Sequence, residues 1–383
     1  MRIIYCIDNP YRIGGIERVT IVKANALANI EGNEIWIVCL LDNQMQVFPI
    51  DEKIHIVSLD INYHDHDWEM NRFQQIFNIW EKKKEHKRKM KEVLDMINPD
   101  IVVSTDGLEK NILSSLSKIS SSHFIREIHL TSNHKLLEAT SLYTKFLCTV
   151  GYYFDYYFYI RRYDKIVVLT NEDKERYWKN NEKVIVIPNP ITISHAQRST
   201  LINKTVIAVG RLERQKNFSS LLRSWAIVNQ QHPDWTLEIW GKGTERNRLE
   251  HLIEELNLQG AAKLMGATND VIGKMAQSSV FVLSSLYEGF PLVIVEAMSC
   301  GLPIVSYECP CGPKDIIKEG CDGFLVQLGD ETMLAKKLCH LIENERERKE
   351  MGRVALEMSK KYAMDVIKDK WMRLFKDFLK EKQ

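Results

Sequence analysis

The chain has 383 residues, of which 45% are hydrophobic and 27% are charged, an ordinary composition for a globular protein that folds in water. Its formal net charge of +1 gives no overall field that would attract nucleic acid, so we expect no nucleic-acid partner. A chain of this length is too long for a typical single core and predicts two domains. Its eight cysteines are scattered, which indicates buried thiols in a reducing cytoplasm and not a disulfide framework.

The N-terminal sequence MRIIYCIDN predicts a first strand from Arg2 to Ile7, because its apolar run is too short for a signal peptide. A turn containing Gly14 and Gly15 follows, and then a helix from about Ile16 to Asn29. This order places unpaired N–H groups of a helix N-terminus at the edge of a sheet, where an anion can bind. A glycine pair by itself most often marks an ordinary turn.

Two segments of the first half raise the question of a membrane surface. The sequence EKKKEHKRKMK (81–91) lies in a long helical stretch, and YYFDYYFYIRRY (152–163) is aromatic nearly throughout. A solvated helix face and a buried helix are the ordinary interpretations, and contact with anionic lipid headgroups is the alternative. No run of about 18 apolar residues occurs, so we expect no transmembrane helix and a cytoplasmic protein, with any membrane contact peripheral.

A histidine ends one of the predicted strands of the first half. Phe124 to Ile128 reads as a strand, and His129 follows it directly. The carboxyl end of a parallel strand is where α/β proteins place site residues, although a lone histidine is more often structural.

The alternation of strands and helices breaks at Pro188-Asn189-Pro190 and restarts at Thr205. We therefore predict an N-terminal domain over 1–190, a linker over 191–204 and a C-terminal domain over 205–362. A helix over 363–383 would follow and could pack back toward the N-terminal domain. Alternating strands and helices predict a parallel sheet with helices on both faces in each domain.

Two cations follow the first strand of the second half. The strand Thr205 to Val209 precedes GRLERQKN (210–217), in which Arg211 and Lys216 flank a turn. Arginine offers a planar fork and lysine a point charge, and both suit a diphosphate. The next strand ends in Gly241-Lys242-Gly243, which lacks the third glycine of a dinucleotide-binding fingerprint.

The sequence SSLYEGFPLVIVEAMSCG (284–301) is the most informative part of the chain. It predicts a turn at Glu288, a helix opened by Pro291 and an end of that helix at Gly301. Glu296 lies inside this apolar helix, where a buried carboxylate needs partners such as the two hydroxyls of a ribose. The ordinary alternative is a solvated helix residue.

These motifs resemble, in order and spacing, the donor-binding domain of retaining GT-B glycosyltransferases of family four, the glycosyl transferases group 1. The resemblance runs from about Val206 to Tyr362 and depends on VGRLERQKN, WGKG, YEGFPLVIVEAMSCGLPIV and GFLV. The first half resembles the family more loosely, through Gly14-Gly15, LTNED and IPNPI. The resemblance implies the GT-B fold, in which two Rossmann-like domains with parallel sheets face each other across a cleft.

The resemblance also implies roles for single residues. Arg211 and Lys216 would neutralise the donor diphosphate as it leaves, and Glu288 would contact the transferred sugar. His129 would lie near the reacting sugar, and Glu296 would hold the ribose. The other donor-binding positions that it implies are Gly14, Gly15, Gly241, Phe290, Pro291, Leu292 and Val293, the last two through their backbone N–H groups.

The implied reaction is a retaining transfer of a hexose or N-acetylhexosamine from a nucleotide diphosphate sugar to a sugar acceptor, which we expect to be lipid-linked. The products would be surface polysaccharides such as capsule or O-antigen, and family frequency alone favours a UDP-sugar. We expect no cofactor and no metal, because two cations and a helix N-terminus neutralise the leaving group. The triplet Asp65-His66-Asp67 could suggest a metal, but it lies far from the donor motifs in the sequence.

Two other functions are compatible with the same fold. A nucleotide-sugar 2-epimerase is the main alternative, and it would convert the free nucleotide sugar without an acceptor. A catalytically silent binding subunit is disfavoured, because every motif residue expected to bind the donor is present.

Overall fold

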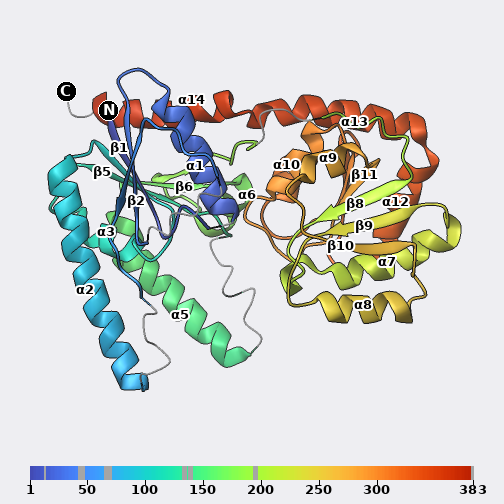
Figure 1. Ribbon diagram of the computed structural model, residues 1–383, viewed down its shortest axis with the longest axis horizontal. Coiled ribbons are helices and arrows are strands. Elements are labelled where there is room, and N and C mark those ends of the chain that lie inside the picture. Colours follow the sequence, from blue (N-terminus) through green and yellow to red (C-terminus); the bar gives the residue numbers. More distant parts are fainter. Residues whose placement is uncertain are drawn as a thin grey trace. The chain divides into compact units, whose positions relative to one another are not determined.

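The computed structural model describes residues 1–12, 14–41, 48–63, 71–131, 136, 141–192 and 197–380. The chain forms two compact units, whose elements are labelled in Figure 1. Unit 1 comprises Met1–Leu169, Lys174–Thr192 and Met364–Gln383, and unit 2 comprises Thr170–Asp173 and Ile193–Ala363. The triplet at 65–67 lies outside the described residues.

Unit 1 contains a seven-stranded parallel sheet in the order β3-β2-β1-β4-β5-β6-β7. Its strands are β1 (Arg2–Ile7), β2 (Glu34–Cys39), β3 (Ile54–Ser58), β4 (Ile101–Ser104), β5 (His123–Glu127), β6 (Lys165–Val168) and β7 (Val184–Val186). The central strands are continuous runs of buried side chains, because helices cover both faces of the sheet.

Helices lie on both faces of this sheet, and the side chains of β1 show the division. Ile3 and Tyr5 belong to the core with α1 and α14, whereas Ile4 and Cys6 belong to the core with α2 and α3. Alternate residues of a strand point to opposite faces, so one strand contributes to two cores. The helices are α1 (Gly15–Ala28), α2 (Arg72–Ile97), α3 (Lys110–Leu116), α5 (Leu142–Phe158) and α14 (Met364–Lys380). Helix α6 (Asn171–Tyr177) is divided, because its first three residues belong to unit 2 and the rest to unit 1.

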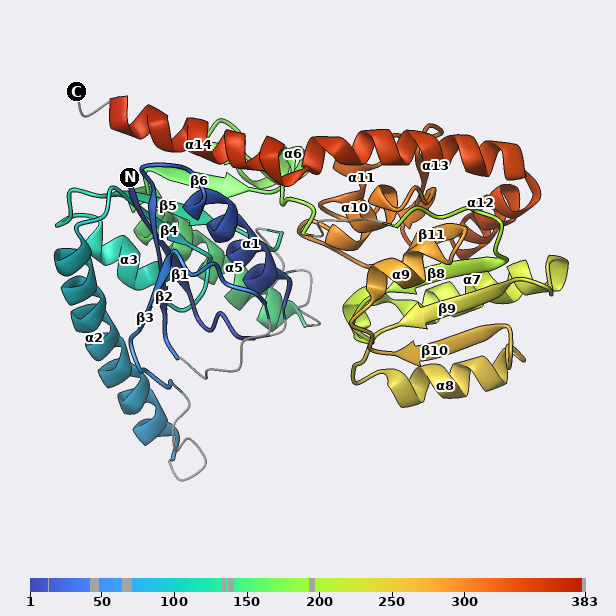
Figure 2. The same ribbon diagram turned by 45° about the horizontal axis from the view of Figure 1, so that its top comes forward.

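Helix α14 belongs to unit 1 although it follows unit 2 in the sequence. It packs beside α1, as Figure 2 shows, and buries one apolar stripe. Trp371 and Phe375 of this stripe are 1% and 0% exposed, and the Lys23 ammonium lies 4.6 Å from the centroid of the Trp371 ring. The core of unit 1 is therefore completed by residues beyond position 363.

Unit 2 contains a six-stranded parallel sheet in the order β10-β9-β8-β11-β12-β13. Its strands are β8 (Thr205–Val209), β9 (Thr236–Trp240), β10 (Ala262–Gly266), β11 (Val280–Leu283), β12 (Ile304–Tyr307) and β13 (Gly323–Val326). The predicted α/β class with two parallel sheets is confirmed.

The helices of unit 2 also lie in two groups. Helix α7 packs against α12, and α10 packs against α13. The α-helices are α7 (Phe218–Gln231), α8 (Arg246–Glu255), α9 (Val271–Ala276), α10 (Leu292–Ser299), α11 (Pro313–Ile316), α12 (Glu331–Glu343) and α13 (Glu345–Ser359), and two short 3-10 helices cover Arg214–Lys216 and Lys360–Tyr362.

All eight cysteines are free thiols, and six of them are buried. Among the residues that the structure describes, no helix is both long enough and apolar enough to cross a membrane.

Replacement of Trp371 tests the assignment of α14 to the first core. We expect Trp371→Ala to lower the free energy of unfolding of unit 1 by about 3–5 kcal/mol, because it leaves a large cavity in the core. Calorimetric unfolding measures this loss. Lys376→Ala, an exposed change on the same helix, is the control and should leave the transition unchanged. Equal transitions for both variants would contradict this packing.

Candidate active site

Four predicted residues of unit 2 lie on three neighbouring loops. Arg211 and Lys216 follow β8, Gly241 follows β9 and Glu288 follows β11. Strand β8 pairs with both β9 and β11, in parallel. The three loops therefore leave the sheet side by side at its carboxyl edge, where ligands of such sheets bind.

An ion pair joins two of these loops. The Lys216 Nζ atom lies 2.6 Å from Glu288 Oε1, and the two side chains are only 14% and 8% exposed. The backbone around them is fixed as well, because Ser284 Oγ donates to the Lys216 carbonyl (2.8 Å) and the Glu288 N–H donates to the Pro310 carbonyl (3.1 Å). The ammonium and the carboxylate are thus held together at the sheet edge.

Arg211 differs from Lys216 in its surroundings. Its side chain is exposed, and its guanidinium makes a long contact, 3.5 Å from Nη2 to Gln215 Oε1. The guanidinium keeps most of its donors directed to solvent, where an incoming anion can accept from them.

Gly241 has a steric reason to be glycine. Its φ is +152°, and a Cβ atom there would lie 1.8 Å from the Gly210 carbonyl oxygen. The loops after β8 and β9 therefore touch backbone to backbone, which only glycine permits.

Helix α10 begins one residue later than predicted. Pro291 is its N-cap, with ψ of 85°, and is not the first helical residue, because this ψ lies outside the helical region. The Leu292 N–H donates to the Phe290 carbonyl (2.8 Å), so this amide already has a partner. Val293 lies in the first turn, where an N–H has no intrahelical acceptor.

Glu296 is buried in α10, with 3% of its surface exposed. The pKa of the Cys300 thiol is raised to about 12, mainly by burial and to a smaller extent by repulsion from the Glu296 carboxylate. The interpretation of Glu296 as a solvated helix residue is therefore wrong. Phe290 is also buried, and its ring lies 5.5 Å from the ring of Tyr362.

The remaining predicted residues belong to unit 1. Gly14 caps α1 with an extended backbone, and Gly15 is the first residue of that helix, after β1. His129 follows β5 and is buried, with its Nε2 atom 3.6 Å from Glu127 Oε1. This distance is longer than a hydrogen bond.

A buried ion pair that was not predicted from the sequence lies next to His129. Lys23 of α1 pairs with Glu127, and their side chains are 2% and 1% exposed. Burial acts to raise the pKa of Glu127, but attraction to Lys23 and His129 outweighs it and holds that pKa at about 2. The signal was Lys23 itself, a charged residue within the apolar sequence TIVKANAL.

A second missed group lies at the carboxyl ends of β1 and β4. Ser104 Oγ donates to Glu109 Oε1 (2.6 Å), and a Cβ atom on Gly107 would lie 2.4 Å from Glu109 Oε2 and 2.7 Å from Asp8 Oδ1. Burial, and then the Asp8 carboxylate, raises the pKa of Glu109 to about 7. This carboxyl group can therefore hold or release a proton near neutral pH.

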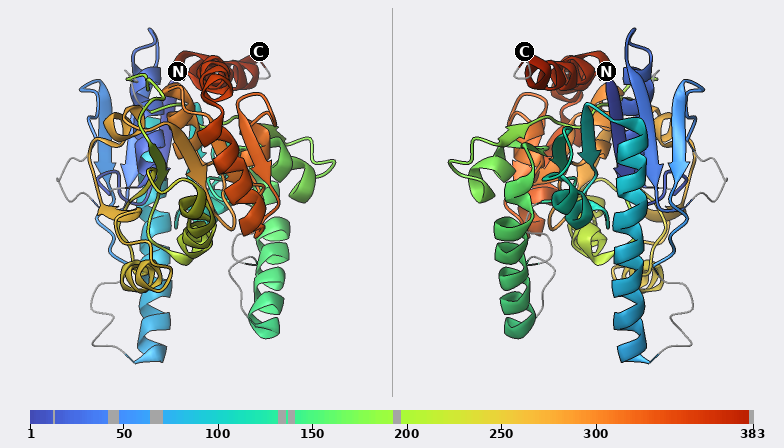
Figure 3. Two further views of the ribbon diagram at one scale, coloured as in Figure 1. Left: turned by 90° about the vertical axis from the view of Figure 1, so that its right-hand side faces the viewer. Right: turned by 90° about the vertical axis from the view of Figure 1, so that its left-hand side faces the viewer.

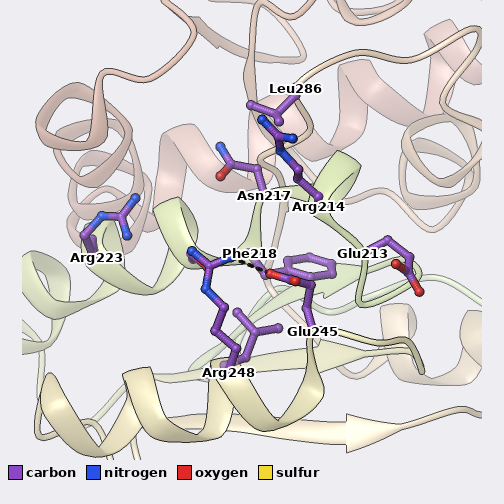
Figure 4. A pocket seen from close by; sticks show the side chains of 10 residues that line it. Glu213, Arg214, Asn217, Phe218, Arg223, Glu245, Arg248 and Leu286 are labelled. Carbon is purple, nitrogen blue, oxygen red and sulfur yellow. Dashed lines mark hydrogen bonds and ion pairs between the residues drawn. The ribbon is translucent and has the colours of Figure 1, made fainter. Parts of the chain in front are cut away.

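Unit 2 also has a hollow of about 160 Å³, lined by residues of α7, α8 and the loops after β8 and β11. Arg214, Arg223 and Arg248 reach it from three different elements (Figure 4). Glu245 pairs with Arg248 at 2.8 Å, and Glu331 pairs with Arg223 at 2.7 Å. None of the predicted donor-binding residues lines this hollow.

Known proteins are similar to most of the chain. Residues 193–358 match the family model described as Glycosyl transferases group 1. An uncharacterized glycosyltransferase of Haemophilus influenzae is 30% identical over 373 residues, which are 96% of this chain and 98% of that protein. A Campylobacter jejuni alpha-1,4-N-acetyl-D-galactosaminyltransferase, whose name specifies a PP-undecaprenol-linked substrate, is 27% identical over 94% of each chain.

The fold has counterparts among solved structures. A variant of S. aureus TarM, crystallised with fondaparinux, alpha-GlcNAc-glycerol and UDP, superposes with a TM-score of 0.76. The match covers 98% of this chain and 99% of that one at 15% identity, so it concerns the fold alone.

The buried pair beside His129 gives a test with a defined pH dependence. We expect Lys23→Met to cost about 3–5 kcal/mol of stability at neutral pH, because it leaves the Glu127 carboxylate buried without its cation. The folded-state pKa of Glu127 is lowered to about 2, so the stabilisation by its charge is present above about pH 4.3 and is lost as the pH falls toward 2. Urea unfolding at several pH values should show the deficit shrinking in acid.

The control is the double variant Lys23→Met/Glu127→Gln, which also removes the unpaired charge. It should recover a large part of the stability at neutral pH. A double variant as unstable as Lys23→Met alone would contradict the electrostatic explanation.

Proposed function

The chain belongs to the glycosyl transferases group 1 family and is a glycosyltransferase, and on this premise we propose a retaining, metal-independent transfer from a UDP-sugar. The transferred group would be a hexose or N-acetylhexosamine. The acceptor would be a lipid-linked saccharide in the synthesis of a surface polysaccharide. The observation that carries the proposal is the arrangement of Arg211, Lys216 and Glu288 on adjacent loops at the carboxyl edge of the unit 2 sheet.

The two cations suit a leaving diphosphate. Arg211 is exposed and can turn its fork to the phosphate oxygens, whereas Lys216 is held in place by Glu288. The first turn of α10 adds the Val293 amide, which has no acceptor within the helix. Fixed positive groups stabilise the charge that develops on the leaving group, and no metal ion is required for this.

Glu288 is a poor nucleophile in this arrangement. Its Oε1 atom is 2.6 Å from the Lys216 ammonium, which neutralises much of its charge. We therefore propose transfer on one face of the sugar without a covalent sugar–enzyme intermediate. The bond from the anomeric carbon to the phosphate oxygen breaks and its electron pair goes to that oxygen. The acceptor hydroxyl bonds to the same carbon and passes its proton to the leaving oxygen.

The donor base and the acceptor are proposed by analogy. The solved TarM variant contains UDP, and the Campylobacter relative is named for a PP-undecaprenol-linked substrate. Glu296, buried eight positions after Glu288, would hold the ribose hydroxyls of the donor. His129, with Gly14 and Gly15 of unit 1, would contact the transferred sugar and the donor.

Thermal unfolding with nucleotides tests the donor site. UDP at 100 times its dissociation constant adds about 2.7 kcal/mol to the stability of the folded chain, which raises the midpoint by several degrees. We expect this shift in EDTA for the wild type and its loss in Glu296→Ala. Glu350→Ala, which removes an exposed carboxylate of α13, is the matched control and should keep the shift.

Each other outcome overturns one part of the proposal. A shift with GDP or ADP but not UDP would exclude a uridine donor. A shift that appears only when Mg²⁺ replaces EDTA would exclude metal independence. No shift with any nucleotide would contradict the donor site itself.

Arg211→Ala tests the charge stabilisation directly. We expect the rate at which UDP forms in the transfer reaction to fall about 10²–10³-fold, because one of the two cations that face the leaving group is lost. Folding should be unaffected, since Arg211 is exposed. The assay uses the UDP-sugar that stabilises the wild type most, with an undecaprenyl-diphosphate-linked saccharide as acceptor, and NMR of the product shows whether the anomeric configuration is retained.

The same assay separates the alternative function. Conversion of the free UDP-sugar to its 2-epimer, without any acceptor, would favour the epimerase over the transferase. Unchanged UDP release in Arg211→Ala would contradict the proposed role of this guanidinium.

A further inference from the structure

Helix α5 has an apolar face that no other described part of the chain covers. None of its 17 residues is buried, and nine of them are large apolar or aromatic side chains that are 49–87% exposed. Single exposed hydrophobic residues are ordinary, but a contiguous set of this size marks an interaction surface. The nine residues, which we call the α5 apolar face, are Leu142, Tyr143, Phe146, Leu147, Val150, Tyr153, Phe154, Tyr157 and Phe158.

These nine side chains share one side of the helix. At 3.6 residues per turn they fall within an arc of about 160°. The opposite side holds Tyr152, Asp155 and Tyr156, which attach the helix to unit 1. The helix is therefore amphipathic with its apolar side turned outward, the reverse of a helix that covers a core.

The attachment fixes this orientation. Arg126 of β5 is 3% exposed. It donates two hydrogen bonds to the Asp155 carboxylate, from Nη1 to Oδ1 at 3.2 Å and from Nη2 to Oδ2 at 2.7 Å. The Tyr156 ring lies 6.0 Å from the Trp178 ring, and Tyr152 Oη donates to the Tyr177 carbonyl (3.3 Å). A bidentate, largely buried pair prevents the helix from rolling its apolar face inward.

Helix α2 carries a related surface. Its first turns expose Ile76, Phe77 and Trp80 by 67%, 61% and 56%. Figure 3 shows α2 and α5 extending from unit 1 in the same general direction, with their N-terminal ends farthest from the sheet. The N-terminal turns of both helices, which carry exposed apolar residues, thus lie toward the same end of unit 1.

A basic group follows the apolar turns of α2. Lys83, Lys84 and Lys87 are exposed, and no acidic partner is found for them among the described residues. Arg88 pairs with Glu92 at 2.7 Å, so its charge is already matched. The surface of α2 therefore changes from aromatic to cationic over about two turns.

We propose that the α5 apolar face and the first turns of α2 dock unit 1 onto an anionic lipid bilayer. Aromatic side chains enter the interfacial region, as tyrosine and tryptophan do at membrane surfaces. Lys83, Lys84 and Lys87 meet the anionic headgroups. This docking goes beyond the proposed transfer and does not depend on the donor site.

Charge favours a bilayer over a second copy of this chain. The acidic residue of α5, Asp155, is neutralised by Arg126, and the exposed charge of its first turns is Lys145. Two copies that met through these helices would bring like charges together, whereas anionic lipid complements them.

Flotation of the full chain with vesicles tests the proposal. At low salt we expect the wild type to float with vesicles of phosphatidylcholine and phosphatidylglycerol and to float weakly with phosphatidylcholine alone. Phe146→Gln/Phe154→Gln should reduce the bound fraction about tenfold, because it removes two buried rings from the docked state. Lys83→Gln/Lys84→Gln/Lys87→Gln should remove the preference for the anionic vesicles.

The matched control is Ile119→Gln, because Ile119 of unit 1 is 65% exposed, as Phe146 is, but lies outside α2 and α5. It should float like the wild type. All variants should keep the UDP-induced rise in unfolding temperature, so a failure of docking can be told apart from a failure of the donor site.

Three results would overturn the proposal. The first is a wild type that floats with neither kind of vesicle. The second is flotation that neither set of substitutions changes. The third is a wild-type dimer in light scattering that Phe146→Gln/Phe154→Gln makes monomeric, without any vesicle binding, which would assign the face to a second copy.

Discussion

The parallel direction of the strands is the constraint on which the site depends. Parallel strands all end at the same edge of the sheet, so the loops that follow β8, β9 and β11 must begin next to one another. This brings Lys216 to Glu288 although 72 positions separate them in the sequence. The same topology brings the backbone of Gly241 into contact with the backbone of Gly210. This contact explains the glycine at position 241 better than the turn in which it lies. The arrangement of these residues is thus a consequence of topology as much as of side-chain chemistry.

The unit 2 site could be predicted from sequence because its signals are local. The strand, the turn at Glu288 and helix α10 follow one another without interruption, and only the first residue of the helix was misplaced. The unit 1 groups could not be predicted in this way. Lys23 and Glu127 are 104 positions apart and meet only because β1, β4 and β5 are neighbours, an order that sequence patterns do not specify. The family and the α/β class were both confirmed, whereas the roles of single residues stay predictions.

Helix α5 shows where composition alone fails. An aromatic segment such as 152–163 is equally typical of a buried helix and of a membrane-facing one. Asp155 is held by the buried Arg126 and thereby sets which side of the helix faces outward. The buried-helix interpretation is wrong for 152–158, since none of the side chains of α5 is buried, whereas Ile160 and Tyr163 at the end of the segment are buried.

The place of α14 in unit 1 has a consequence for how the chain folds during synthesis. Trp371 and Phe375 fill the core beside α1, yet they are translated after every strand of unit 2. Domains usually fold in the order in which they leave the ribosome. Here the unit that begins first cannot close its core until more than 360 residues have been made, whereas all the strands and core helices of unit 2 are available earlier. The apolar side of α1 therefore stays uncovered for most of the translation of the chain. Chaperones can bind there for longer than they can bind to the helices of unit 2.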